Sequence, residues 1–215
     1  MILQVTAHGA IADAAPAERL AAQFSSHGCV VLPGFLAPSL LARVQDEVDA
    51  ARFVERTHGD DIATELWMSE NACLGMLHFL VNDPVVFEFV ERVTGMRPLT
   101  SFHGRVYRRL PGVHHDSWHT DVYPDRSVGM SLNLGREPYD GGVFEIRNEG
   151  SGEVLGAIAN TGVGDAILFS IADGLEHRVT PVTGRVPKTA FAGWFGGSRN
   201  YREALRRDPF LREEA

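Results

Sequence analysis

Residues 99–134, LTSFHGRVYRRLPGVHHDSWHTDVYPDRSVGMSLNL, decide the fold that this sequence predicts. The segment begins and ends with β-rich runs, and similar short runs follow it, separated by Gly, Pro, Asn and Asp. The predicted strands are Leu99–Arg108, Ser127–Leu134, Val143–Arg147, Val154–Ala159, Ala166–Ser170, Val179–Val182 and Thr189–Phe195. Such a series is typical of a closed or double-sheet β architecture. We therefore predict a double-stranded β-helix (a cupin-like jelly roll) over about residues 98–196.

The first hundred residues are predicted to be mostly helical. Pro16 and Pro38 suit helix starts, while Asp83 suits an N-cap with Pro84 at the first helical position. Cys29–Leu32 is a short β-like run between two of these helices.

These features predict one domain over residues 1–215. A helical region at about 14–95 is expected to pack on one sheet of the jelly roll, and residues 198–215 to form a short helix and tail. Whether residues 54–80 form a lid is open from sequence.

Composition excludes several classes of protein. The net charge is −8 and no basic cluster is present, which argues against binding to nucleic acid. No apolar run approaches the ~20 residues of a membrane span. The start of the sequence lacks the pattern of a signal peptide, and Cys29 and Cys73 are expected to be buried free thiols. A cytoplasmic location with no membrane partner is the expectation.

The predicted loop after Arg108 contains His119-Thr120-Asp121. Side chains alternate along extended backbone, so residues i and i+2 can face one ion. With His177 they would make a two-histidine, one-carboxylate iron site that leaves coordination positions open for a co-substrate and O₂. His114 and Asp116 offer a second H-x-D pair. We prefer His119 and Asp121, because the other pair directly follows a Pro-Gly turn and is expected at the mouth of a pocket.

Several segments together resemble the iron(II)/2-oxoglutarate-dependent oxygenase superfamily, and most nearly its prolyl-4-hydroxylase-like branch. The segments are Tyr107, His119-Thr120-Asp121, Ser131-Leu132-Asn133 with Gly141-Gly142-Val143-Phe144, Gly164–Phe169, and His177–Val182 followed by Lys188 and Trp194-Phe195. The resemblance implies that His119, Asp121 and His177 bind Fe(II).

The resemblance also implies a pocket for 2-oxoglutarate. Lys188 stands where relatives have an Arg or Lys for the far carboxylate, and it is the one lysine beside 19 arginines. Tyr107 matches a tyrosine that donates to the same carboxylate, and Ser131 stands where many relatives have another tyrosine. Arg185 is the competing cation, but it is expected to face solvent in a turn.

The implied activity is hydroxylation of a C–H bond with Fe(II), 2-oxoglutarate and O₂, giving succinate and CO₂, with ascorbate as an added reductant. A carboxylate at position 121 favours hydroxylation over halogenation. The expected substrate is a small molecule, an amino acid, a natural-product intermediate or a carrier-bound compound. Three alternatives remain from sequence: a prolyl hydroxylase acting on a peptide or protein, a redox-inert cupin-type metalloenzyme, and a non-catalytic sensor. The oligomeric state is open.

Overall fold

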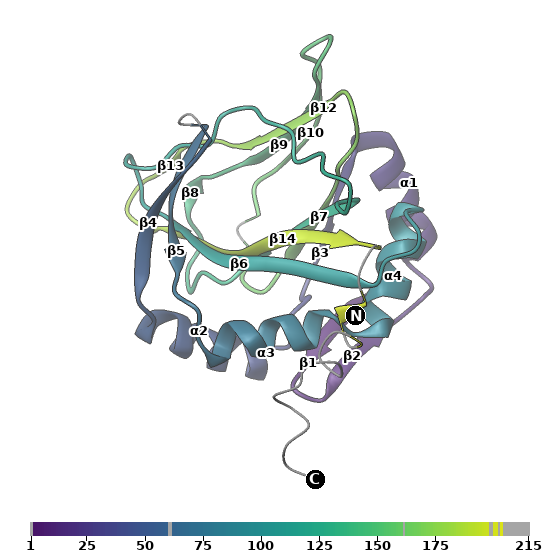
Figure 1. Ribbon diagram of the computed structural model, residues 1–215, viewed down its shortest axis with the longest axis horizontal. Helices are drawn as coiled ribbons and strands as arrows, with labels where there is room; N and C mark the ends of the chain where they lie inside the picture. The colour runs from purple at the N-terminus through teal and green to yellow at the C-terminus, as the bar shows by residue number, and fades with distance from the viewer. Residues whose placement is uncertain (1, 60–61, 161, 198–199, 202, 204–215) are drawn as a thin grey trace.

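The computed structural model describes residues 2–59, 62–160, 162–197, 200, 201 and 203. They form three layers (Figure 1): helices α2 and α3, a large sheet that contains β6 and β14, and a smaller sheet that contains β9, β10 and β12. The two sheets enclose the interior of the roll.

The large sheet has the strand order β3-β11-β7-β14-β6-β5-β4, with every neighbouring pair antiparallel. Its strands are β3 (Cys29–Leu32), β4 (Phe53–His58), β5 (Ala63–Met68), β6 (Ser101–Arg109), β7 (Val128–Asn133), β11 (Ala166–Ser170) and β14 (Lys188–Gly196).

The facing layer contains the three-stranded sheet β10-β9-β12 and the two-stranded sheet β13-β8. Its strands are β8 (Asp140–Gly141), β9 (Phe144–Asn148), β10 (Val154–Ile158), β12 (Leu175–Val179) and β13 (Val182–Thr183). A separate hairpin is formed by β1 (Leu3–Thr6) and β2 (Gly9–Ala12).

The described helices begin either at a proline or at a side-chain cap. They are α1 (Ala17–His27), α2 (Pro38–Ala50), α3 (Ala72–Val81) and α4 (Pro84–Thr94). The Asp83 side chain accepts from the Val85 N–H, which confirms the predicted cap of α4. Gly28 and Gly95 end α1 and α4 in the left-handed conformation, which glycine adopts without strain.

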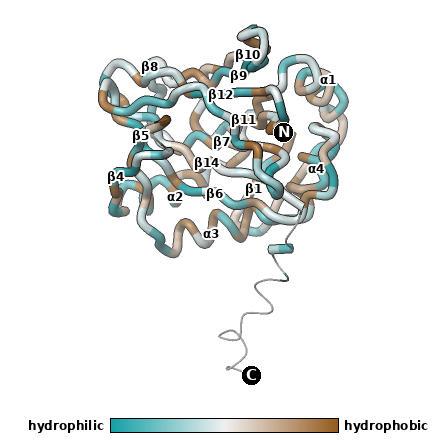
Figure 2. Tube along the Cα trace, turned by 45° about the horizontal axis from the view of Figure 1, so that its top comes forward, coloured by the Kyte–Doolittle hydropathy of each residue, from teal (hydrophilic) through white to brown (hydrophobic). Residues whose placement is uncertain are grey.

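Two hydrophobic clusters hold the layers together. The larger lies between the helices and the large sheet, where Phe102, Phe191 and Phe195 are fully buried. The apolar helix α3, brown in Figure 2, contributes Leu77 and Val81 to it. The smaller cluster lies between the two sheets and includes Phe144.

The predicted jelly roll over about 98–196 is confirmed, and six of its seven predicted strands match β6, β7, β9, β10, β11 and β14. The strand predicted at Val179–Val182 is wrong. Its residues fall at the end of β12 and the start of β13, and His177 lies within β12. The prediction also missed β4 and β5, which lie in the region expected to be mostly helical. The expected tail, residues 198–215, lies almost wholly outside the described residues.

Cys29 and Cys73 are buried free thiols, as expected. Among the described residues no single helix is long and apolar enough to cross a membrane. Helices α3 and α4 have the required length and composition only when taken together, and they are bent by 58° relative to each other.

Candidate metal centre and co-substrate cavity

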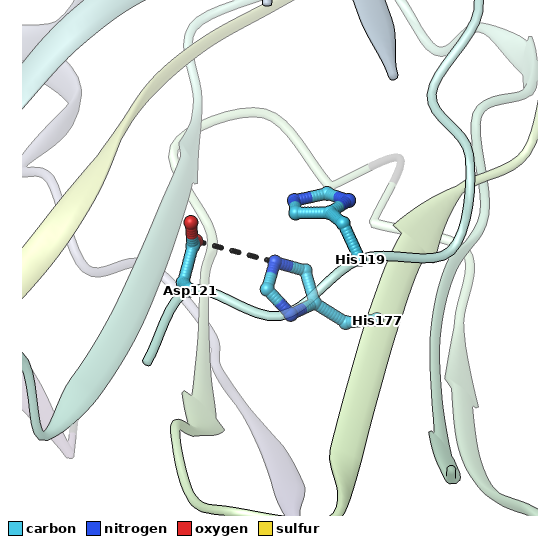
Figure 3. Close-up of side chains that lie close together, drawn as sticks. All are labelled: His119, Asp121 and His177. Carbon is cyan, nitrogen blue, oxygen red and sulfur yellow. Dashed lines mark ion pairs between the residues drawn. The ribbon is translucent and has the colours of Figure 1, made fainter. Parts of the chain in front are cut away.

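The structure brings together His119, Asp121 and His177 (Figure 3). His119 and Asp121 lie in the loop after β6, while His177 comes from the middle of β12. His119 and His177 form an antiparallel bridge: each backbone N–H donates to the carbonyl of the other, at 3.1 and 2.9 Å. Directly opposed residues place their side chains on the same face. Strand pairing itself therefore sets the two imidazoles side by side, with ring centroids 4.4 Å apart.

The three side chains fit a metal ion. Their candidate ligand atoms all lie within 4.8 Å of one another, and His177 Nε2 is 3.4 Å from Asp121 Oδ2. Two donors at ~2.0–2.2 Å from one ion lie at most ~4.4 Å apart. Small side-chain rotations are therefore enough for convergence on one ion. Two imidazoles and one carboxylate are the donor set of non-haem iron sites with open positions.

The partners of His119 determine which of its nitrogens is available. Its Nδ1 lies 2.8 Å from the Ser117 carbonyl oxygen and 3.5 Å from Asp116 Oδ1. Because a carbonyl can only accept, Nδ1 carries the proton and Nε2 is left for a metal. Asp116 Oδ1 is buried and has no hydrogen-bond partner among the described residues, so a negative atom faces this imidazole.

Two side chains orient Asp121. The indole N–H of Trp194 donates to Oδ2 at 2.6 Å, and the Arg126 guanidinium donates to Oδ1 at 3.3 Å. Burial alone would raise the pKa of Asp121, but the hydrogen bond and charge of His177 and the bond from Trp194 lower it to about 2. Asp121 is thus an anion, as a metal ligand must be. The Arg126 guanidinium also stacks on the Trp194 ring at 3.7 Å.

His177 is held by aromatic rings from both sheets. Its ring lies 4.7 Å from that of Phe169 and 5.8 Å from that of Phe144. These contacts bury His177 and fix the plane of its imidazole.

The three side chains open into a cavity of about 340 Å³ between the sheets. Tyr107 and Ser131, both predicted to bind the co-substrate, line this cavity. Burial raises the pKa of the Tyr107 phenol, so the group remains a neutral donor.

Lys188 does not line this cavity, although it lies on the face of β14 that also carries Trp194. It is buried, and its ammonium donates to the Gly142 carbonyl at 2.8 Å. Burial, and then the nearby charge of Arg109, lower the pKa of Lys188 to about 7, although Asp116 acts in the opposite direction. The competing cation, Arg185, is exposed as expected.

Arg109 is the deep cation that sequence reasoning missed. It pairs in register with Lys188 across β6 and β14 and lines the cavity. Its guanidinium donates to Glu65 Oε2 at 3.1 and 3.2 Å and to Asp116 Oδ2 at 2.8 Å. Two carboxylates therefore compensate its charge. Arg109 directly follows the predicted strand 99–108 and lies two residues after Tyr107. Because residues i and i+2 of a strand lie on the same face, this spacing could have indicated that Arg109 faces the cavity as Tyr107 does.

The alternative H-x-D pair has structural roles. His114 is buried and its Nδ1 accepts from the Leu110 N–H at 2.8 Å. Asp116 is also buried, and it accepts from the Val179 N–H at 2.8 Å as well as from Arg109. Asp116 lines the cavity and His114 does not, and each of them satisfies a backbone donor. Neither belongs to the metal-binding cluster found among the described residues.

The segment considered as a lid, residues 54–80, contributes part of the cavity wall. The hairpin β4–β5 extends the large sheet, and His58 and Glu65 from it line the cavity. These two side chains form a hydrogen bond of 2.7 Å. Its charge-assisted form raises the pKa of His58.

Comparison with known proteins agrees with this geometry. Residues 103–196 match the family model described as the 2OG-Fe(II) oxygenase superfamily. The matched segment contains the whole metal-binding cluster, His119, Asp121 and His177. It also contains the three residues predicted to bind the co-substrate, Tyr107, Ser131 and Lys188. A comparison with curated proteins found no match.

Solved structures share the fold at low sequence identity. A 2OG-Fe(II) oxygenase family oxidoreductase from Burkholderia pseudomallei is 20% identical, with a TM-score of 0.65 over 90% of this chain and 95% of its own. A prolyl-4-hydroxylase from Pseudomonas putida is 18% identical, with a TM-score of 0.61 over 83% and 97%. The α-ketoglutarate-dependent epimerase SnoN from nogalamycin biosynthesis is 16% identical, with a TM-score of 0.62 over 86% and 84%.

Over residues 103–196, the jelly-roll core of this chain therefore matches the 2OG-Fe(II) oxygenase superfamily. Members of the superfamily are oxidoreductases that require Fe(II), 2-oxoglutarate and O₂, and this is the class of enzyme that the core defines.

Proposed function

We propose that this enzyme is a dioxygenase that hydroxylates a C–H bond of a small-molecule, amino-acid or natural-product substrate. The cluster of His119, Asp121 and His177, opening into the cavity between the sheets, carries the proposal. In this proposal the three residues bind Fe(II), and Tyr107, Ser131 and Lys188 bind 2-oxoglutarate. When bound, Fe(II) with 2-oxoglutarate and O₂ supplies the oxidising power, and the co-substrate leaves as succinate and CO₂.

Each ligand has a task that the contacts support. The Ser117 carbonyl fixes the tautomer of His119, and Trp194 holds Asp121 by a bond of 2.6 Å. Outer partners of this kind orient metal ligands and raise metal affinity. The aromatic rings around His177 keep water from that side of the centre.

Charge balance favours Lys188 over Arg109 as the partner of the far carboxylate. Arg109 is already bonded to two carboxylates, whereas the Lys188 ammonium donates to the neutral Gly142 carbonyl. A buried cation without a compensating anion is costly, and a bound carboxylate would relieve that cost. The phenol of Tyr107 and the hydroxyl of Ser131 would supply neutral donors along the way.

The size of the cavity favours a small substrate. Sites for small molecules commonly enclose ~300–1,000 Å³, and the cavity of about 340 Å³ adjoins a second one of about 430 Å³. A prolyl hydroxylase acting on a peptide is the second candidate, since solved structures that share the fold include a prolyl hydroxylase from Trichoplax adhaerens in complex with a peptide fragment.

A substrate-free assay tests the activity. The purified protein with Fe(II), 2-oxoglutarate, ascorbate and O₂ should release succinate slowly, and the anaerobic Fe(II) protein should develop a metal-to-ligand absorption band when 2-oxoglutarate is added. Asp121→Ala should lose both signals, while Arg185→Ala, which changes an exposed turn, should keep both. A redox-inert metalloenzyme would bind the metal yet give neither the band nor succinate.

A further inference from the structure

A second cavity of about 430 Å³ adjoins the metal centre. It shares His58, Tyr107, Arg126 and Trp194 with the first cavity, so the two meet beside the side chain that holds Asp121. Trp67 and Arg105 line only the second cavity. The proposed co-substrate residue Lys188 lines neither of them.

The charges around the second cavity are unbalanced. Arg126 and Arg105 line it and are partly buried, with side-chain exposures of 32% and 42%. The acid that lines it, Glu70, is 83% exposed and lies 3.8 Å from Arg105. Such an exposed and distant pair contributes little. The deep acids Glu65 and Asp116 are already bonded to Arg109, and Asp121 accepts one bond of 3.3 Å from Arg126.

Both cations rest on aromatic rings. The Arg105 guanidinium lies 4.9 Å from the Trp67 ring centroid, and that of Arg126 lies 3.7 Å from the Trp194 ring centroid. Stacking of this kind fixes the plane of a guanidinium and leaves its edge free to donate. A planar donor edge beside apolar walls suits a carboxylate attached to a hydrocarbon or aromatic group.

The co-substrate cannot reach both ends of the roll. Lys188 and Trp194 lie six residues apart on β14, which separates their positions by roughly 20 Å. A short dicarboxylate that chelates the metal and extends toward Lys188 leaves Arg105 with only the exposed Glu70 as an anion, and Arg126 with only Asp121, which is itself a candidate metal ligand. We propose, on the basis of the function above, that the second cavity binds the carboxylate of a small organic-acid substrate through Arg105 and Arg126.

Matched acids and amides test this assignment. The probes are phenylacetate against phenylacetamide and N-acetylphenylalanine against its primary amide. Each is titrated by calorimetry and ligand-observed NMR into protein loaded with Mn(II) and saturating 2-oxoglutarate. At least one acid should bind at least tenfold more tightly than its amide, because the amide is uncharged. Equal affinity within both pairs, or no detectable binding of either acid, would overturn the proposal.

Three variants separate a substrate role from simple packing. Arg105→Gln and Arg126→Gln should each reduce the acid-to-amide ratio at least threefold, whereas Arg92→Gln, which removes an equal charge from the exposed face of α4, should leave it unchanged. Arg126 also contacts Asp121, but the ratio cancels any change in metal occupancy. If the acid-to-amide affinity ratio is undiminished in both Arg105→Gln and Arg126→Gln, the two arginines have only a structural role and do not bind the carboxylate. Failure of Mn(II) or 2-oxoglutarate to bind would instead contradict the proposed function, before any acid is added.

Discussion

Lys188 shows how the chemistry of this site depends on single residues. It is buried between strands, beside Arg109 on β6 and Asp116 on the following loop, with the Tyr139 ring centroid 5.4 Å away. Its charge is partly suppressed in the empty protein, because burial and Arg109 oppose it. A carboxylate bound beside Lys188 would therefore stabilise its charged form.

Replacing Lys188 by Ala should weaken 2-oxoglutarate binding at least a hundredfold. Removing one partner of a buried charge pair costs roughly 3–5 kcal/mol, and a tenfold change in affinity corresponds to about 1.4 kcal/mol. Titration of the absorption band of the anaerobic Fe(II) protein measures the effect. Arg185→Ala is the matched control and should be nearly silent. The assignment of the carboxylate partner fails if Arg185→Ala loses the band and Lys188→Ala keeps it.

Affinity for 2-oxoglutarate should fall as the pH rises from about 7 to 9. The pKa of Lys188 is lowered to about 7 in the empty protein, first by burial and then by Arg109, and a bound carboxylate raises it again. Binding therefore requires a proton that is present below pH 7 and is lost above it, so affinity falls by up to ~10-fold per pH unit. Lys188→Arg should bind with little dependence on pH, since a guanidinium does not titrate in this range. A flat wild-type profile would rule the mechanism out.

Asp121→Ala should reduce iron affinity by more than the roughly 10–100-fold that loss of an outer partner costs, because it removes a candidate ligand. Equilibrium dialysis against Fe(II) or Mn(II) measures this. Asp116→Asn is the isosteric control at the alternative pair and should retain the metal. Metal binding that survives Asp121→Ala but not Asp116→Asn would move the site to the other H-x-D pair.

At the residue scale, the sequence predicted site residues that belong to a motif, and it missed residues that reach the site only through the folding of the chain. His119, Asp121 and His177 were predicted because their types and spacing match one chemistry, and the structure brings them together. Arg126 follows Asp121 in a loop with no periodic pattern, so nothing in the sequence indicated that it stacks on Trp194.

The elements were predictable where apolar residues alternate or recur. Ala166–Ser170 is a buried run and its bounds were predicted correctly. In β12 only His177 is buried, and Glu176 and Arg178 pair with charged neighbours on β9, so the strand lacks an apolar pattern. The edge strand β4 is mostly exposed for a similar reason.

Gly193→Ala should destabilise the large sheet. A Cβ atom there would lie 2.0 Å from the His103 carbonyl oxygen and 2.4 Å from Gly104 Cα, both of them backbone atoms of β6 that cannot move independently. We expect a loss of at least ~1–3 kcal/mol in the free energy of unfolding, measured by urea denaturation.

Gly75→Ala is the control for this substitution. Gly75 lies in α3 with open space around its Cβ position, so alanine should stabilise by about 0.4–1 kcal/mol. Equal effects of the two substitutions would mean that β14 and β6 are not as closely paired as described.

At the scale of the whole molecule, the proposed ligands join the two sheets. His177 belongs to the small sheet, whereas Asp121 is bonded to Trp194 of the large one. A metal bound to both would add a connection between layers that otherwise meet through a small apolar cluster.

Loading with Mn(II) and 2-oxoglutarate should therefore raise the unfolding temperature. A ligand at 100 times its Kd stabilises the folded state by about 2.7 kcal/mol, which corresponds to roughly 5–10 °C for a domain of this size. Differential scanning calorimetry measures the shift. Asp121→Ala should show almost none, and an equal shift in this variant would place the bound metal elsewhere.

The two backbone hydrogen bonds between His119 and His177 have a consequence for the metal-free enzyme. Because strand pairing sets the two imidazoles side by side, the donor set is assembled by folding and not by the ion. Many small metal-dependent domains unfold when a chelator removes their ion. Here the metal-free protein should stay folded with its ligand residues in place. Loss of iron should therefore be reversible, and added iron should restore activity without refolding.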